Sequence, residues 1–116
     1  MKVFKTLAAA AAVAAFALPV HAQTEIQWWH SMGGALGEWV NDLAKDFNAS
    51  QKEYKVVPTY KGTYDESMTA SIAAFRAGNA PHILQVFEVG TATMMAAKGA
   101  VVPVGKVLAD AGYQFD

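Results

Sequence analysis

The sequence of 116 residues contains no cysteine and little charge, and these two shortages exclude several classes of protein. Without cysteine there are no disulfide bonds, no thiolate zinc sites and no cysteine nucleophile. Nine basic residues stand against ten acidic ones, whereas binding to nucleic acid needs a concentrated basic surface. The composition, 53% hydrophobic and 16% charged, is that of one globular domain at most. We therefore expect no nucleic-acid partner.

The first 22 residues have the pattern of a signal peptide. Lys2 and Lys5 form a basic start, residues 7–18 are apolar, and residues 20–22 place small side chains at the two positions that signal peptidase reads. The alternative is a membrane span, but the apolar run is shorter than the roughly 20 residues that a bilayer requires. We predict export, with residues 1–22 as the signal peptide and residues 23–116 as the exported part.

Strand patterns alternate with helix patterns after this segment. Aromatic and β-branched residues predict strands at 25–30, 54–60 and 82–89. Helical spacing and turn signals predict helices around 36–47, 63–77, 91–98 and 107–111. This order predicts an α/β fold with a parallel sheet and right-handed crossovers. Three strands are few for a self-contained parallel sheet.

The apolar residues of these elements also predict a core. In the first helix the spacing predicts one apolar face, formed by Leu36, Val40, Leu43 and Phe47. The three tryptophans are interpreted as core residues in preference to surfaces that stack on sugars.

The second helix has clear boundary signals. Thr63 and Glu66 have the spacing of a capping box, Gly78 ends the helix, and Met68, Ile72 and Phe75 mark its buried face.

The third strand is nearly continuous in its apolar residues. Residues 82–89 therefore suit a central strand that is covered on both faces of the sheet. Pro58 in the second strand, by contrast, predicts an edge position.

Three polar side chains follow the strands, at the edge of a parallel sheet where ligands bind. They are His30, Tyr64 and Glu88. Glu88 interrupts an apolar strand, where a carboxylate is costly without partners, and it suits the hydroxyl groups of a polyol or sugar. Its alternative role is a helix cap or a solvated strand end. Tyr64 precedes a helix and suits a ligand oxygen, or else packs as a half-buried aromatic residue against Tyr60.

Patterns typical of enzymes are missing. His30 and Ser31 lie beside each other, but the sequence has no nucleophile elbow, no second carboxylate at a useful spacing and no HExxH motif. The glycine pair at 33–34 lacks the rest of a phosphate-binding loop. We expect no catalytic residue, no metal site and no cofactor.

Three strings carry a resemblance to a known family: WHSM at 29–32, YKGTY at 60–64 and EVGTATMM at 88–95. With the runs between them, essentially the whole chain after residue 22 resembles the start of the glycerol-3-phosphate-binding periplasmic proteins of bacterial ABC importers. These proteins belong to extracellular solute-binding protein family 1. The three strings are more specific than the general pattern of that family.

The resemblance implies a periplasmic, two-lobed, non-catalytic protein. It would close on glycerol 3-phosphate or related glycerophosphodiesters and deliver them to a membrane permease. Two ligand-contacting positions of the family match here, Tyr64 and Glu88. Family members are several times longer, so residues 23–116 would form the first, incomplete part of the N-terminal α/β lobe. Two alternatives stay open: a sugar-binding member of the same transporter family, and a small exported α/β interaction module.

We predict that the chain on its own is poorly stable and binds ligand weakly or not at all, because the resemblance implies that the hinge, the second lobe and the residues that complete the site are not part of it, and because its modest core has no disulfide to support it. Heating a purified sample with and without millimolar glycerol 3-phosphate tests this prediction. A cooperative melt that the ligand shifts upward would contradict it.

Overall fold

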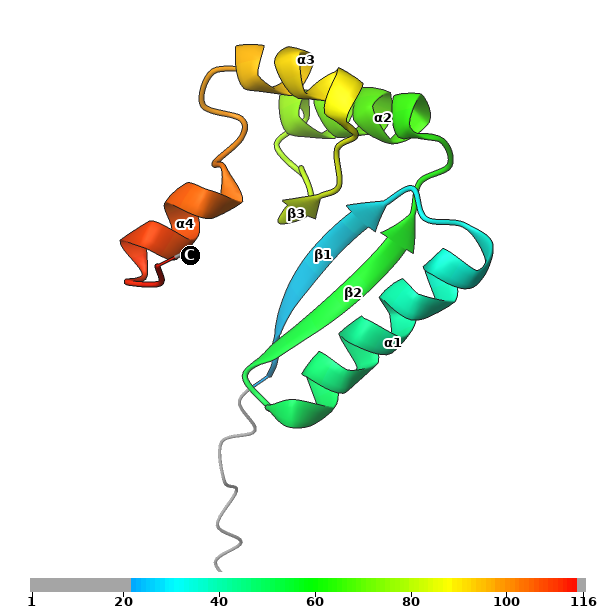
Figure 1. The fold of residues 1–116 in the computed structure, drawn as a ribbon, viewed down its shortest axis with the longest axis vertical. Coiled ribbons are helices and arrows are strands. Elements are labelled where there is room, and N and C mark those ends of the chain that lie inside the picture. Colours follow the sequence, from blue (N-terminus) through cyan, green and yellow to red (C-terminus); the bar gives the residue numbers. More distant parts are fainter. Residues whose placement is uncertain (1–21, 115–116) are drawn as a thin grey trace, which may run out of the picture.

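The described part of the chain is built around a three-stranded parallel sheet (Figure 1). The computed structural model describes residues 22–114, so the predicted signal peptide lies, apart from Ala22, outside the described residues. The elements in chain order are β1 (Thr24–His30), α1 (Gly34–Ser50), β2 (Tyr54–Tyr60), α2 (Tyr64–Arg76), β3 (Ile83–Leu84), the 3₁₀ turn η1 (Glu88–Gly90), α3 (Thr91–Ala96) and α4 (Val104–Asp110). The prediction of an α/β fold with a parallel sheet is confirmed.

Strand β1 is the central strand, in the order β2-β1-β3. It pairs with β2 along its whole length, from Thr24 opposite Tyr54 to His30 opposite Tyr60. Its pairing with β3 covers two residues of each strand. Since all three strands are parallel, their carboxyl ends lie toward the same edge of the sheet. We call this edge the rim.

Side chains extend the short pairing between β1 and β3. The imidazole Nδ1 of His82 accepts a hydrogen bond of 3.0 Å from the amide of Gln27, and the amide of Ser31 donates to Oε1 of Gln85 at 2.9 Å. These contacts lie just before and just after β3. Polar side chains thereby satisfy main-chain groups of β1 that a longer neighbouring strand would otherwise bind.

Strand β3 is much shorter than the sequence predicts. The prediction of a strand at 82–89 is confirmed only for residues 83–84 and is wrong beyond them, because the pairing with β1 ends at Leu84 and the chain turns into η1 at Glu88. The prediction of a central strand covered on both faces is also wrong, since β3 lies at an edge of the described sheet and Ile83 is 43% exposed. A run of apolar residues cannot distinguish a strand from an irregular segment that packs beneath helices.

Helix α1 packs on β2 through a few residues. Val40 and Ala44 are its buried residues. The amide of Asn48 donates to the carbonyl of Val56 at 2.8 Å, and its oxygen accepts from the Val56 N–H at 2.7 Å. The helix therefore binds β2 both by apolar contact and by main-chain recognition.

The predicted apolar face of α1 is buried only at Val40. Leu36 is 59% exposed, Trp39 is 60% exposed, and Leu43 and Phe47 are also exposed, so the prediction of Trp39 as a core residue is wrong. The helix approaches the sheet along the line through Val40 and Ala44, and no described element covers the flank beside that line. The periodicity gives an apolar helix face correctly but cannot say which part of it meets a neighbour.

Helix α2 has the predicted boundaries. Its capping box is present, because the Thr63 hydroxyl accepts from the Glu66 amide and the Glu66 carboxylate accepts from the Thr63 amide. Gly78 follows the helix with a φ of 75°, a left-handed conformation that glycine adopts without strain. These two signals are local, which explains why the sequence predicts them well.

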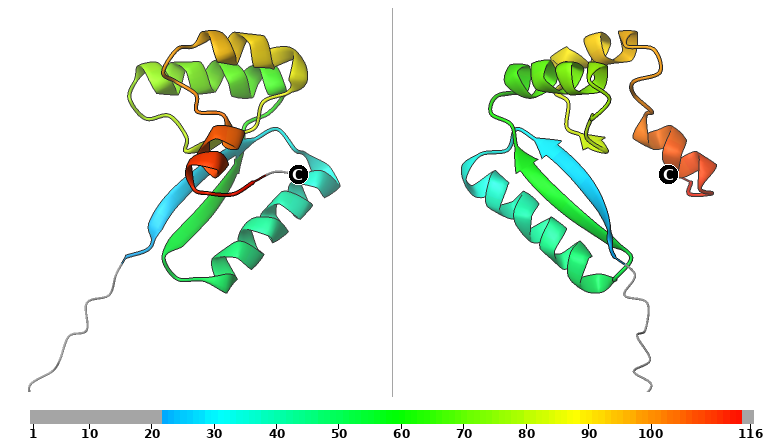
Figure 2. Two further views of the ribbon diagram at one scale, coloured as in Figure 1. Left: turned by 60° about the vertical axis from the view of Figure 1, so that its left-hand side comes forward. Right: turned by 180° about the vertical axis from the view of Figure 1, so that it is seen from behind.

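The buried face of α2 differs from the prediction. Ser67 and Ser71 are the buried residues, while Phe75 is 46% exposed. Small side chains allow the helix to lie close to its neighbours. Helices α2 and α3 lie side by side beyond the carboxyl end of β1, as all the views agree (Figure 2).

We predict that Thr63→Ala lowers the free energy of unfolding by about 1 kcal/mol, because it removes the acceptor for the Glu66 amide. A urea titration followed by far-UV circular dichroism measures the change. Thr69→Ala, at an exposed position inside the same helix, is the matched control. Equal effects of the two substitutions would contradict a capping role for Thr63.

Candidate ligand-binding site

Tyr64 lies at the rim as the first residue of α2. Its half-buried ring stacks on the ring of Phe87, with centroids 5.0 Å apart and an angle of 25° between the planes. The ring of Tyr64 thus packs against Phe87 and not against Tyr60, the partner that the sequence suggested. Tyr60 lies instead beside His30, with ring centroids 6.1 Å apart.

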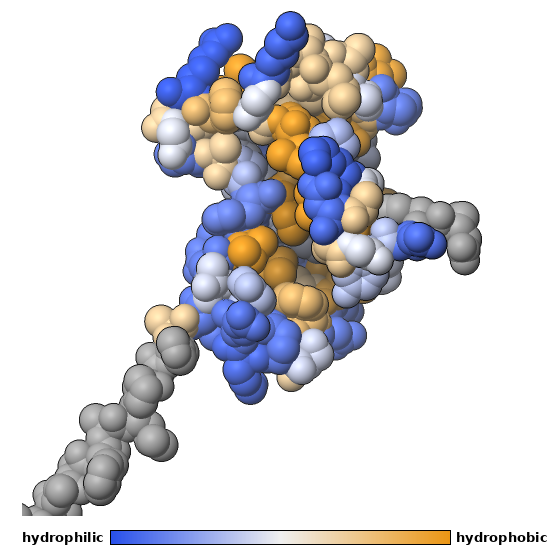
Figure 3. Space-filling view, turned by 90° about the vertical axis from the view of Figure 1, so that its left-hand side faces the viewer, coloured by the Kyte–Doolittle hydropathy of each residue, from blue (hydrophilic) through white to orange (hydrophobic). Residues whose placement is uncertain are grey.

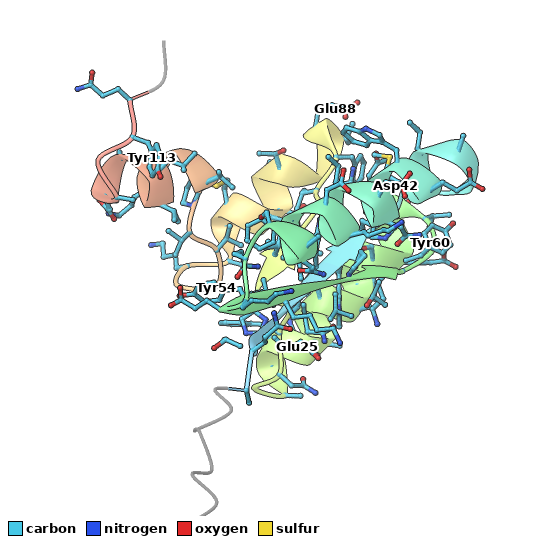
Figure 4. The ribbon with its side chains drawn as sticks, turned by 90° about the horizontal axis from the view of Figure 1, so that it is seen from below. Glu25, Asp42, Tyr54, Tyr60, Glu88 and Tyr113 are labelled. Atoms are coloured by element: carbon cyan, nitrogen blue, oxygen red, sulfur yellow. The ribbon has the colours of Figure 1, made fainter. Side chains whose placement is uncertain are left out.

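Glu88 is the first residue of η1 and is exposed. The premise that a carboxylate interrupts an apolar strand is therefore wrong. Because the Glu88 carboxylate is not buried, the cost of burying a charge gives no reason to expect a ligand there. Figure 4 places Glu88 at the outer edge of the molecule, away from Glu25 and Tyr54 at the amino ends of β1 and β2. An exposed carboxylate at this position is free to accept hydrogen bonds from ligand hydroxyl groups.

Phe87 brings the two candidate residues into the same region. It stacks on Tyr64 and directly precedes Glu88. Gly90 permits this packing, because a Cβ atom at that position would lie 2.8 Å from the Phe87 ring. Sequence reasoning missed Phe87, although an aromatic residue beside a candidate ligand residue was a usable signal.

A positive charge also lies near the rim. Lys61 follows β2 directly, and its Nζ atom lies 3.8 Å from the centroid of the Trp29 ring. Such a cation–π contact holds the ammonium group close to the protein surface. The region beyond the strands thus contains a phenol, a carboxylate and an ammonium group.

His30 has a structural role at the rim. Its side chain is 3% exposed and its Nδ1 accepts a hydrogen bond from the Met32 amide at 3.3 Å. Burial lowers the pKa of His30 below its usual value. His30 is therefore a buried, hydrogen-bonded structural residue and not a free group at the rim.

A hollow of about 490 Å³ lies beside His30, bounded by the start of α1 and the end of β2. Neither Tyr64 nor Glu88 lines it. Glu38 lies in the wall of this hollow, and its negative charge would repel an anion bound at the N-terminus of α1. The candidate residues thus belong to an open surface at the rim and not to this hollow.

Among residues 22–114, no group of three or more histidine and acidic side chains is placed to hold a metal ion. Within the same range, no helix combines the length and the hydropathy needed to cross a bilayer.

Comparison with known proteins identifies the relatives of the chain, although no family model matches it. The chain is 59% identical to the sn-glycerol-3-phosphate-binding periplasmic protein UgpB of Brucella abortus (strain 2308), over 82% of this chain and 22% of the relative. It is 54% identical to the protein of that name from Rhizobium meliloti, over 87% of this chain and 24% of the relative. It is 56% identical to that from Escherichia coli O1:K1, over 100% of this chain and 26% of the relative.

The chain is a homologue of the sn-glycerol-3-phosphate-binding periplasmic proteins. It spans about a quarter of the length of these UgpB relatives. Their names support a periplasmic location for the chain, as the sequence predicts. The UgpB proteins are named as binding proteins and not for a reaction, which agrees with the prediction that the chain is not an enzyme.

We predict that the folded chain loses stability as the pH falls through about 6.5, the usual pKa of an unfolded histidine. The pKa of His30 is lowered in the folded state, so the unfolded state binds the proton more readily. Acidification therefore stabilises the unfolded state relative to the folded one. A series of urea titrations from pH 8 downward measures the effect, with His30→Gln as the variant that lacks it. An NMR pKa for His30 above 6.5 would contradict the prediction.

Proposed function

We propose that the chain is part of the solute-binding component of an ABC importer, which captures sn-glycerol 3-phosphate or glycerophosphodiesters for a membrane permease. The observation that carries the proposal is an identity of 54–59% to proteins named for binding this ligand. The match to the E. coli relative covers 100% of this chain and therefore spans the rim.

We further propose that residues 23–116 form the first part of the N-terminal α/β lobe. The parallel sheet with strands ending at one rim supports this assignment, because such sheets bind ligands at that edge. The match to only 22–26% of each UgpB relative supports an incomplete lobe. Residues 1–22 are the signal peptide in this proposal.

Glu88 and Tyr64 have different roles in the proposed site. The ionised Glu88 accepts hydrogen bonds from glycerol hydroxyl groups, and its charge keeps it away from the phosphate. Tyr64 donates its phenolic proton to a hydroxyl or phosphate oxygen. The Tyr64–Phe87 stack supports this assignment, because Phe87 directly precedes Glu88 in the chain and so keeps Glu88 in the region of Tyr64.

The test uses a chimera in which this chain replaces the matched part of the E. coli UgpB relative. We expect the chimera to bind sn-glycerol 3-phosphate in isothermal titration. Glu88→Gln and Tyr64→Phe should each weaken binding by about tenfold or more, because the first replaces a charged acceptor with a neutral amide and the second removes the phenolic donor. Tyr113→Phe, at an exposed tyrosine near the far end of the described chain, is the matched control.

Maltose serves as the competing ligand in the same titration. Binding of maltose without binding of sn-glycerol 3-phosphate would favour a sugar-binding member of the transporter family. Binding of neither ligand by a folded chimera would favour an interaction module. Unchanged affinity in both site variants would remove Tyr64 and Glu88 from the proposed site.

A further inference from the structure

Gln85 is the one polar residue in the apolar run 83–87. Its neighbours Leu84 and Val86 line an apolar hollow of about 660 Å³, and Figure 3 shows apolar surface gathered on this side of the molecule. Gln85 is half-buried and does not line the hollow. A polar side chain in such surroundings is costly unless it is hydrogen-bonded. The hydrogen bonds of Gln85 therefore show what this side chain does.

Gln85 completes the pairing of β3 with β1. Its N–H donates to the carbonyl of Trp29 at 2.9 Å, as the residue after Leu84 does in a parallel pair with this register. In a continuing strand, the main-chain carbonyl of Gln85 would then accept from the amide of Ser31. The side-chain Oε1 of Gln85 accepts that bond instead, also at 2.9 Å. The side chain thus takes the place of a main-chain carbonyl.

This exchange allows the main chain to leave the sheet. Because the Gln85 side chain binds the Ser31 amide, the chain turns away from β1 without leaving that donor unpaired. Phe87 then stacks on Tyr64, with ring centroids 5.0 Å apart, and η1 begins at Glu88. The point at which the chain leaves β1 therefore influences where Phe87 and Glu88 lie.

We propose that Gln85 is a positioning residue of the ligand-binding site, which holds Phe87 against Tyr64 and so keeps Glu88 within reach of the ligand. Gln85 itself does not touch the ligand. Its side chain fixes the last bond between β1 and the segment that carries Glu88. This inference rests on the proposed function, because it requires Glu88 to contact the ligand.

The test measures the affinity of the chimera for sn-glycerol 3-phosphate by isothermal titration. Gln85→Met keeps the length of the side chain but removes the acceptor for the Ser31 amide, and we expect the affinity to fall at least about fivefold. Gln51→Met is the matched control. Gln51 is also half-buried and its Oε1 accepts from the Tyr54 amide at 2.7 Å. Tyr54 lies at the amino end of β2, away from Glu88 (Figure 4), so the affinity should stay unchanged.

A double-mutant cycle separates positioning from a general loss of stability. If Gln85 acts through Glu88, Gln85→Met should weaken binding by less than about twofold once Glu88→Gln is present. A role in stability alone would give two independent losses that multiply. Circular dichroism shows whether each variant keeps the fold. Gln85→Asn replaces Gln85→Met if the latter unfolds, because its side chain stays polar but is one methylene too short for the Ser31 amide.

Each result supports or overturns the proposal. Unchanged affinity in Gln85→Met, an equal loss in Gln51→Met, or losses that multiply in the double variant would overturn it. Unfolding of both Gln85 variants would do so as well, since Gln85 would then support the fold as a whole. These outcomes leave the proposed function intact, because the unsubstituted chimera still binds. If the unsubstituted chimera does not bind sn-glycerol 3-phosphate, the proposed function itself fails, and the two failures are thereby distinguished.

Discussion

The position of β1 between two parallel neighbours is the constraint on which the rest of the structure depends. Its register with β2 places His30 opposite Tyr60, and its short pairing with β3 places Trp29 opposite Leu84. The chain leaves all three strands at one rim, toward the start of α1, the start of α2 and η1 respectively. The segments that carry Tyr64 and Glu88 therefore start from the same rim, and they contact each other through the rings of Tyr64 and Phe87.

Few of the apolar side chains around the sheet are buried. Val40, Ala44 and Met94 are the buried apolar residues among those described, while large apolar side chains on α1 and α4 stay exposed. Burial of apolar area is the main favourable term in folding. A sheet with so little buried apolar area relies more than usual on its polar contacts. Those contacts include the bonds from His82 and Gln85 to β1 and from Asn48 to β2.

Local signals in the sequence predict local structure well. The capping box of Thr63 and Glu66 and the end of α2 at Gly78 are each determined by a few neighbouring residues, and both are confirmed. The edge position that Pro58 predicts for β2 is confirmed among the described strands. The parallel α/β class is also confirmed, since it follows from the order of elements. Predictions that depend on distant partners are less successful. The extent of β3 depends on how far β1 can pair, and the exposure of Trp39 depends on which element reaches α1.

The predictions for the candidate site also succeed in part and fail in part. The sequence predicts that Tyr64 and Glu88 belong to one rim, and the structure places Phe87 as the contact between their segments. The exposure of Glu88 agrees with the alternative of a solvated residue, but the sequence does not predict the 3₁₀ turn that begins there, because an apolar run conceals where a strand ends. Assignment of both residues to a ligand remains a proposal that rests on the resemblance and on this packing.

A crystal structure of the chimera with sn-glycerol 3-phosphate tests the central claim, that the strand order around β1 brings Tyr64 and Glu88 to one ligand. The account predicts Tyr64 Oη and a Glu88 carboxylate oxygen within about 3.2 Å of ligand oxygens, with Glu88 at the glycerol end. A ligand bound away from the rim, or side chains of Tyr64 and Glu88 that face different surfaces, would contradict it.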